Sequence, residues 1–213
     1  MSADTTRRAA ILEPVLVFAM IMQYIWGLRS RHPFEWLLIL GLMLLSHWLR
    51  HEPARTLGFQ AVHWSECWEE YTPALALLAL LMLAAGILLQ TTRAIPFDRA
   101  LVAWMAYLPW GLFQQYILNG YFLNRFTAVL SPRSAPMAAA ALFSSAHLPN
   151  LFLMAVTLVT GYICARIYQK HNNLWFLGLA HATVGFFLFL VVPDSISHHL
   201  TVGPGFLKTG VGG

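Results

Sequence analysis

The chain contains a series of long apolar segments that are separated by short polar stretches. The segments cover about residues 11–28, 34–49, 73–89, 100–121, 135–147, 151–167 and 174–192. A helix needs about 20 apolar residues to cross a bilayer. It also pairs its own backbone groups, as a lipid environment requires. The pattern therefore predicts an all-α fold, a polytopic transmembrane helix bundle of about seven spans, with six to eight as the range.

The composition favours a membrane protein over a soluble domain. Of the 213 residues, 58% are hydrophobic and only 10% are charged, whereas soluble domains carry about 25% charged residues. The net charge of +4 comes mostly from arginines in short loops, which suits anionic lipid headgroups. No basic face interleaved with stacking aromatics lies outside the apolar segments. We therefore expect membrane lipid as a partner and no nucleic acid.

The order of the segments predicts one structural domain with three parts. Residues 1–71 hold the N-terminal helices and an interfacial segment, residues 72–193 form the core, and residues 194–213 form a tail. The Gly-rich end of the tail predicts a mostly disordered terminus. With seven spans, more Arg and Lys residues flank the side of the N terminus than the opposite side. This bias predicts a cytoplasmic N terminus.

Polar side chains occur inside apolar segments of residues 99–193, a stretch that contains no aspartate or glutamate. They are Gln114 and Gln115 in one segment, His147 at the end of a second and His181 within a third. Polar and titratable groups are costly inside a bilayer and mark functional sites. The stretch therefore predicts a shared site with two imidazoles and two amides but no local carboxylate.

The acidic residues lie outside this stretch. Residues 50–71 form the longest polar segment, in which His63, Glu66 and Glu70 could share a helical face with a spacing compatible with metal ligation. We favour an interfacial helix there, with its tryptophans at headgroup level. Glu13 precedes a proline, and we expect it at a helix start, where the helix dipole favours an acid.

Three segments of the core resemble the motifs of a known family. They are residues 114–121 (QQYILNGY), 143–150 (FSSAHLPN) and 179–185 (LAHATVG). Their order and spacing resemble the CAAX prenyl protease and bacteriocin-processing family, a set of intramembrane endopeptidases also called the Abi family. Its motifs are a Glu-Glu-x3-Arg helix, a Phe-x3-His segment and a His-x3-Asn or His-x3-Asp segment. The resemblance covers about residues 70–192, so that 72–193 is a CAAX-protease-like core.

The resemblance implies a hydrolase and assigns roles to two histidines. Phe143, His147 and His181 keep the residue types of the family motifs. In that family the first glutamate and the first histidine activate the attacking water, while the second histidine and the asparagine stabilise the oxyanion. By resemblance, the chain would be an intramembrane peptidase of the bacterial inner membrane. Its substrate would be a peptide or a lipid-modified protein.

Four positions depart from the family pattern. Gln114 and Gln115 stand where the acids should be, Asn119 where the arginine should be, and Gly185 where the asparagine should be. General-base catalysis contributes about 10²–10⁴-fold, and an amide cannot take a proton from water, although it can orient one. A buried guanidinium without the acids would lack its partner. We interpret the changes in the first motif as a coherent neutral redesign.

Several functions stay open on these residues. In one, His147 is the base, His181 and Gln114 orient water or bind the oxyanion, and no cofactor is needed. Zinc held by His147 and His181 is less favoured, because catalytic zinc normally takes three protein ligands. The alternatives are a catalytically silent member that binds or chaperones a membrane partner, and a non-proteolytic enzyme that acts on a lipid-like substrate. Asn119 and Asn150 are candidate supporting amides.

Overall fold

A computed structural model describes residues 3–209, with the side chains of residues 11–208. In this part of the chain the regular elements are all helical, which confirms the all-α class. The longer helices are α1 (Ala3–Gln23), α2 (Trp36–Leu49), α3 (Trp64–Leu88), α4 (Phe97–Gln115), α6 (Ser134–Ser145), α7 (Leu151–His171) and α8 (Leu174–Val191). The π-helical η1 (Tyr24–Leu28) continues α1, and the π-helical η2 (Tyr116–Leu123) with α5 (Asn124–Thr127) continues α4. The short elements α9 (Asp194–Ser197), η3 (His198–Leu200) and α10 (Pro204–Thr209) follow α8.

Four of the described helices are long and apolar enough to cross a membrane. They are Ile11–Leu28, Trp64–Leu88, Leu151–His171 and Leu174–Val191. Helix α2 is apolar but has only 14 residues. Helix α6 has 12 residues, which gives it a length of about 18 Å, less than the hydrocarbon thickness. The chain is an integral membrane protein, and the count of about seven spans stays a prediction.

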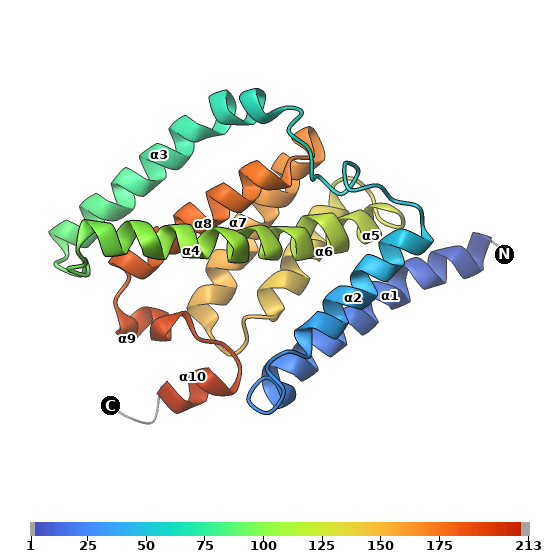
Figure 1. Cartoon of the computed structure of the whole chain (residues 1–213), viewed down its shortest axis with the longest axis horizontal. Helices are drawn as coiled ribbons and strands as arrows, with labels where there is room; N and C mark the ends of the chain where they lie inside the picture. Colours follow the sequence, from blue (N-terminus) through green and yellow to red (C-terminus); the bar gives the residue numbers. More distant parts are fainter. Residues whose placement is uncertain (1–2, 210–213) are drawn as a thin grey trace.

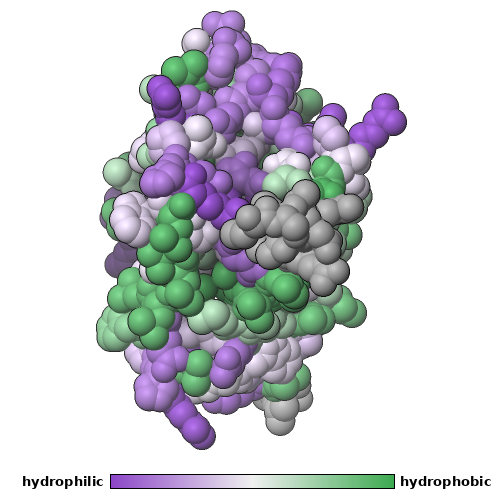
Figure 2. All heavy atoms as spheres, turned by 90° about the vertical axis from the view of Figure 1, so that its right-hand side faces the viewer, coloured by the Kyte–Doolittle hydropathy of each residue, from purple (hydrophilic) through white to green (hydrophobic). Residues whose placement is uncertain are grey.

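The outer surface of the bundle is largely apolar. On the face shown in Figure 2, hydrophobic residues form a band between more hydrophilic ends. Leu38 of α2 is 68% exposed and Leu80 of α3 is 64% exposed. A surface with many leucines at this exposure is suited to contact with lipid tails rather than with water.

Helix α4 runs across the bundle and packs against α8, while α6 packs against α7 (Figure 1). Helices α1 and α2 lie side by side at one end of the molecule. Glycines bring α4 and α8 into close contact. A Cβ atom at Gly111 would lie 2.8 Å from the carbonyl oxygen of Gly178, and one at Gly178 would lie 2.9 Å from the Cα of Leu112. Small residues commonly permit such approach between membrane helices.

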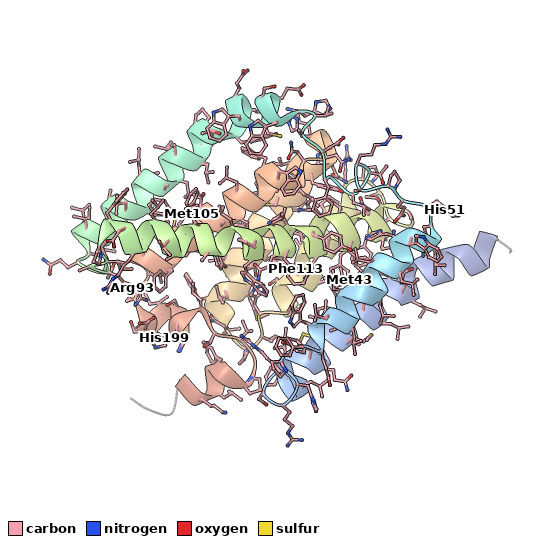
Figure 3. All side chains as sticks on the ribbon, in the orientation of Figure 1. Met43, His51, Arg93, Met105, Phe113 and His199 are labelled. Carbon is pink, nitrogen blue, oxygen red and sulfur yellow. The ribbon has the colours of Figure 1, made fainter. Side chains whose placement is uncertain are left out.

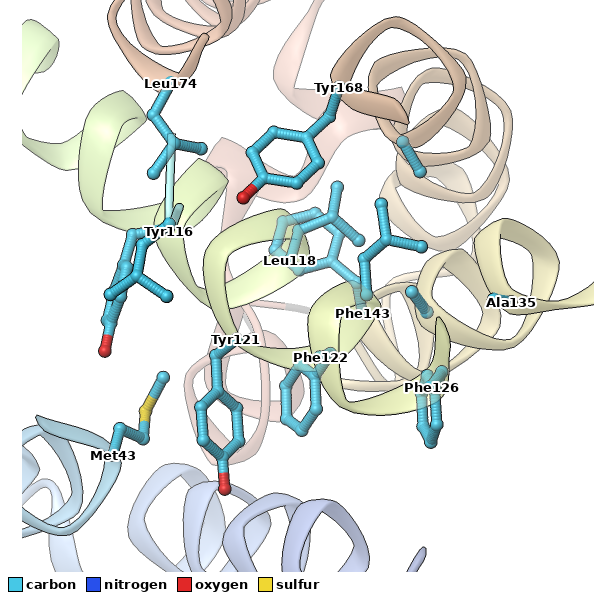
Figure 4. Packing of buried hydrophobic residues seen from close by; sticks show 14 of the residues in the cluster. Met43, Tyr116, Leu118, Tyr121, Phe122, Phe126, Ala135, Phe143, Tyr168 and Leu174 are labelled. Atoms are coloured by element: carbon cyan, nitrogen blue, oxygen red, sulfur yellow. The ribbon is translucent and has the colours of Figure 1, made fainter. Parts of the chain in front are cut away.

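The hydrophobic core surrounds the segment that continues α4. Tyr116, Leu118 and Tyr121 of η2 are each at most 4% exposed and belong to one cluster with Met43 of α2 (Figure 4). Wide helical turns of this π type often occur at functional sites. Here η2 begins directly after α4 and contains Asn119. The core therefore fixes the position of the first polar motif.

Two polar segments are built differently from the predictions. Residues 50–63 form turns and loops, and the remainder of the expected interfacial helix is the beginning of α3. Residues 194–209 are largely helical, and polar contacts join their beginning to the loop before α4. Arg93 Nη2 lies 2.7 Å from Asp194 Oδ1, and His199 Nδ1 lies 3.0 Å from the same oxygen. Figure 3 shows Arg93 and His199 at this end of the molecule. Residues 210–213 of the tail lie outside the described residues.

Candidate active site

The α4–α8 contact brings two of the predicted site residues together. Gln115 Nε2 lies 3.0 Å from His181 Nδ1, and Asn119 Nδ2 donates to Gln115 Oε1 at 2.7 Å. Gln115 is 1% exposed and Asn119 is fully buried. Because the Gln115 oxygen accepts from Asn119, its NH2 group faces the imidazole, and His181 Nδ1 is the acceptor. A neutral imidazole that accepts at Nδ1 carries its proton on Nε2.

His147 has the opposite arrangement. It lies in the turn between α6 and α7, and its Nδ1 is 2.9 Å from the carbonyl oxygen of Phe143. A carbonyl oxygen only accepts, so Nδ1 carries the proton and Nε2 offers a lone pair. Among the described residues, the imidazole of His147 contacts the ring of Phe143 and that of His181 contacts the ring of Tyr107, and no hydrogen bond or ring contact joins the two histidines. The hydrogen-bond partners thus assign opposite tautomers to the two neutral histidines. His147 carries its proton on Nδ1, whereas His181 carries its proton on Nε2.

The remaining predicted residues lie differently. Gln114 is half-buried, and its amide has no hydrogen-bond partner among the described residues. Asn150 is fully buried and accepts from the backbone N–H of Leu153 at 3.1 Å, as the N-cap of α7. Its NH2 group donates to the carbonyl oxygen of Ser197 at 2.9 Å. These bonds join α7 to α9, and none of them reaches either histidine.

A tyrosine occupies the space that a side chain at Gly185 would need. A Cβ atom at Gly185 would lie 2.6 Å from Tyr107 Cε1 and 3.3 Å from Tyr107 Oη. The ring centroid of Tyr107 is 6.3 Å from that of His181. Helix α4 thus supplies a phenol where the third motif lacks its amide. The sequence interpretation missed Tyr107, although its spacing of four from Gly111, and of eight from Gln115, marks one helical face.

A second polar cluster surrounds Arg125 of α5, which is 3% exposed. Its Nε donates to Glu13 Oε1 at 3.0 Å, and its Nη1 donates to Glu52 Oε1 at 2.8 Å. Its Nη2 is 3.0 Å from both Ser46 Oγ and His47 Nδ1. Glu13 lies within α1, not at a helix start, so that prediction is wrong. The acid is paired with an arginine from a distant helix, as buried charges require.

Potential metal ligands gather elsewhere. Among the described residues, neither His147 nor His181 belongs to a group of three His, Cys, Asp or Glu side chains that could hold a metal ion. The group that does form consists of His63, Glu66 and His171. The donor set at the α4–α8 contact is therefore neutral and suits hydrogen bonding and proton transfer.

The helices and the polar residues between α4 and α8 define an integral membrane protein with a polar site inside its bundle. Residues 96–187 match a family model described as Type II CAAX prenyl endopeptidase Rce1-like. The matched range includes all three motif segments and confirms the resemblance to the CAAX prenyl protease and bacteriocin-processing family. No curated protein and no solved structure gave a match.

Proposed function

We propose that the protein is an intramembrane peptidase in which a pair of neutral histidines performs the work of a glutamate-based site. The observation that carries the proposal is the difference in hydrogen-bond partners, a carbonyl oxygen at His147 Nδ1 and the Gln115 amide at His181 Nδ1, from which opposite tautomers are assigned. Attack of water on a peptide carbonyl needs a base for the proton and donors for the developing oxyanion. An imidazole with an acceptor Nε2 and another with a donor Nε2–H supply these two functions. The substrate is a peptide or a lipid-modified protein at membrane depth.

The proposed reaction follows from these roles. His147 Nε2 takes a proton from water as the water oxygen bonds to the carbonyl carbon. Burial lowers the pKa of the His147 imidazole below its ordinary value of 6.5, so the ring is neutral near pH 7 and its Nε2 can accept the proton. His147 then returns the proton to the leaving amine as the C–N bond breaks. The half-buried amide of Gln114 orients the water, for which its donor and acceptor ends are suited. No cofactor takes part.

Two donors are available for the oxyanion. His181 Nε2–H is one, and the hydroxyl of Tyr107, whose ring lies beside His181, is the other. Gln115 and Asn119 are positioning residues, because their hydrogen bonds hold His181 in the donor tautomer. In this scheme a bonded amide pair fixes an imidazole where the family uses charged groups.

The direct test is proteolysis by the purified protein in liposomes, against membrane peptides with and without a prenyl group. We expect His147→Ala and His181→Ala each to lower the cleavage rate about 10²–10⁴-fold. His32→Ala is the matched control, because the His32 side chain is 59% exposed in a turn. Absence of cleavage by the parent protein across the panel would refute the peptidase.

A catalytically silent protein is the second candidate, and the neutrality of Gln115 and Asn119 favours it. Such a protein would bind or chaperone a membrane partner in the same polar site. A non-proteolytic enzyme with a lipid-like substrate would use the same site. These candidates predict binding, or lipid turnover, without cleavage of peptides in the liposome assay. For each function we propose the bacterial inner membrane as the location, with a cytoplasmic N terminus and no nucleic-acid partner.

A further inference from the structure

The group of potential metal ligands lies at the other end of α7 from His147. His171 is the last residue of α7, and His147 precedes its first turn. A helix of 21 residues separates the two positions by about 30 Å. In Figure 1 the beginning of α3 and the end of α7 lie at the same, upper end of the molecule. The ligand atoms of His63, Glu66 and His171 all lie within 4.8 Å of one another.

We propose that His63, Glu66 and His171 bind a divalent transition metal of the zinc type, at a site separate from the two histidines of the candidate active site. Tetrahedral zinc with bonds of about 2.1 Å holds its ligand atoms roughly 3.4 Å apart. His171 Nδ1 is already 3.6 Å from Glu66 Oε2. A small closing movement of side chains would therefore complete the coordination.

The donor types select the metal. Two imidazole nitrogens and one carboxylate oxygen suit zinc and its neighbours, which accept nitrogen and oxygen ligands. Magnesium and calcium prefer oxygen alone. Three protein ligands leave one position for water. The site is thus selective by its chemistry for a transition metal.

The surroundings of His171 fit a ligand role. Its side chain is 4% exposed, and its two nitrogens face different carboxylates. Nδ1 faces Glu66, while Nε2 lies 3.2 Å from Glu70 Oε2. A metal-binding histidine commonly donates its second N–H to a carboxylate, which orients the ring. We therefore assign Glu70 as a positioning residue and Glu66 as the ligand.

The charges around Glu66 agree with the assignment. Lys170 Nζ contacts both oxygens of Glu70, at 2.6 and 2.7 Å. Among the described residues, the ion-pair partners of Glu66 are His63 and His171 alone, so a bound cation would balance its charge. His63 has a left-handed backbone with φ of +62°. This conformation turns the chain into α3, whose first residue follows His63.

The bound metal would act as a clamp. His63 immediately precedes α3 and Glu66 lies in its first turn, whereas His171 is the last residue of α7. A ligand that binds only the folded chain raises its stability by mass action. We therefore expect zinc to raise the thermal midpoint of the protein by holding these two regions together.

The test uses the full chain in detergent, without an affinity tag, after treatment with a chelator. Zinc is titrated in competition with a chromophoric chelator, and the thermal midpoint is measured with and without zinc. We expect one equivalent of zinc and a higher midpoint. His63→Ala should weaken binding at least tenfold, and Glu70→Gln should weaken it about tenfold. The His63 side chain is 43% exposed, so its removal leaves the packing intact.

Two controls give the outcome a clear meaning. His32→Ala should leave zinc affinity unchanged, as should the double variant His147→Ala/His181→Ala. Absence of saturable binding in the parent, or unchanged affinity in His63→Ala, would overturn the site. Histidine–carboxylate ion pairs would then account for the cluster. Loss of zinc binding in the His147/His181 double variant would also overturn the proposed site, because it would show that zinc binds at His147 and His181 instead. Peptidase activity is measured separately, so either proposal can fail alone.

Discussion

At the scale of single residues, Gln115 and Asn119 form a buried amide pair where the family pattern has a glutamate and an arginine. Gln115→Glu would place a carboxylate at a position that is 1% exposed, beside an amide. We expect a loss of about 2–4 kcal/mol in the free energy of unfolding, because its neighbours, the Asn119 amide and the neutral imidazole of His181, carry no charge to offset the cost of burying a carboxylate. Adding Asn119→Arg should recover part of this loss by supplying the partner.

Unfolding in mixed micelles measures the resulting double-mutant cycle. A coupling energy of about 1–3 kcal/mol between positions 115 and 119 would show that the stability effect of one substitution depends on the other. The control is Gln114→Glu, at a half-buried position, where we expect a smaller loss. Additive effects at positions 115 and 119 would contradict the interpretation as a neutral redesign.

Tyr107 carries a second prediction at this scale. Tyr107→Phe removes the hydroxyl but keeps the ring that fills the space at Gly185. If the hydroxyl donates to the oxyanion, kcat should fall about 10²–10³-fold, with little change in KM or in the thermal midpoint. Steady-state kinetics and thermal unfolding of the same preparation distinguish these effects. An unchanged kcat would assign Tyr107 a packing role only.

Local spacing predicts some of these contacts and not others. Gln115 and Asn119 are four residues apart, which places them on one helical face, and their hydrogen bond agrees. The contact of Tyr107 with Gly185 depends on how two helices cross, which no local pattern encodes. The same holds for Glu13 and Arg125, which are 112 residues apart in the chain.

At the scale of helices, the close approach of α4 and α8 holds Gln115 against His181. Gly111→Ala would add a Cβ atom 2.8 Å from the carbonyl oxygen of Gly178, and backbone cannot move aside cheaply. We expect a loss of about 1–3 kcal/mol in the free energy of unfolding. The proposed peptidase activity should fall as well, because the two helices must separate.

Gly41→Ala in α2 is the matched control, since a Cβ atom there would meet nothing within 4 Å. It should be neutral or stabilise by up to about 1 kcal/mol, since alanine is the better helix former. Chemical unfolding and the liposome assay measure the two effects. Equal behaviour of both variants would mean that the α4–α8 contact does not position the site.

The helix that continues α4 shows where hydropathy fails as a guide to element boundaries. The apolar pattern predicts an end near residue 121, but the helical path continues to Thr127. Arg125 resembles a flanking residue in the sequence. It lies inside the fold because Glu13 and Glu52 supply opposite charges from α1 and from the loop after α2. Hydropathy counts such an arginine as exposed, whereas its burial depends on partners from other segments.

At the scale of the whole molecule, the Arg125 cluster joins the N-terminal helices to the part of the chain that matches the family model. Glu52 lies in the loop after α2, and its carboxylate accepts from Arg125 at 2.8 and 3.0 Å. Burial raises the pKa of Glu52, but hydrogen bonds from Arg125 and His47 outweigh this effect and hold the pKa below its ordinary value of 4.5. The cluster therefore makes the attachment of α1 and α2 sensitive to acid.

The sign of this dependence follows from the lowered pKa. A carboxyl group with a lowered pKa in the folded state contributes stability that is fully present above the unfolded pKa. That stability is lost as the pH falls below 4.5, through the folded pKa of Glu52. We expect the thermal midpoint to fall over this window.

Glu52→Gln should lower the free energy of unfolding by about 1.5–3 kcal/mol at pH 7, since it weakens charged hydrogen bonds, and should reduce the acid dependence. Glu69→Gln, at an exposed position of α3, should retain the dependence of the parent. Thermal unfolding between pH 7 and pH 3 compares the three proteins, and equal acid slopes in the parent and Glu52→Gln would exclude Glu52 as the group responsible.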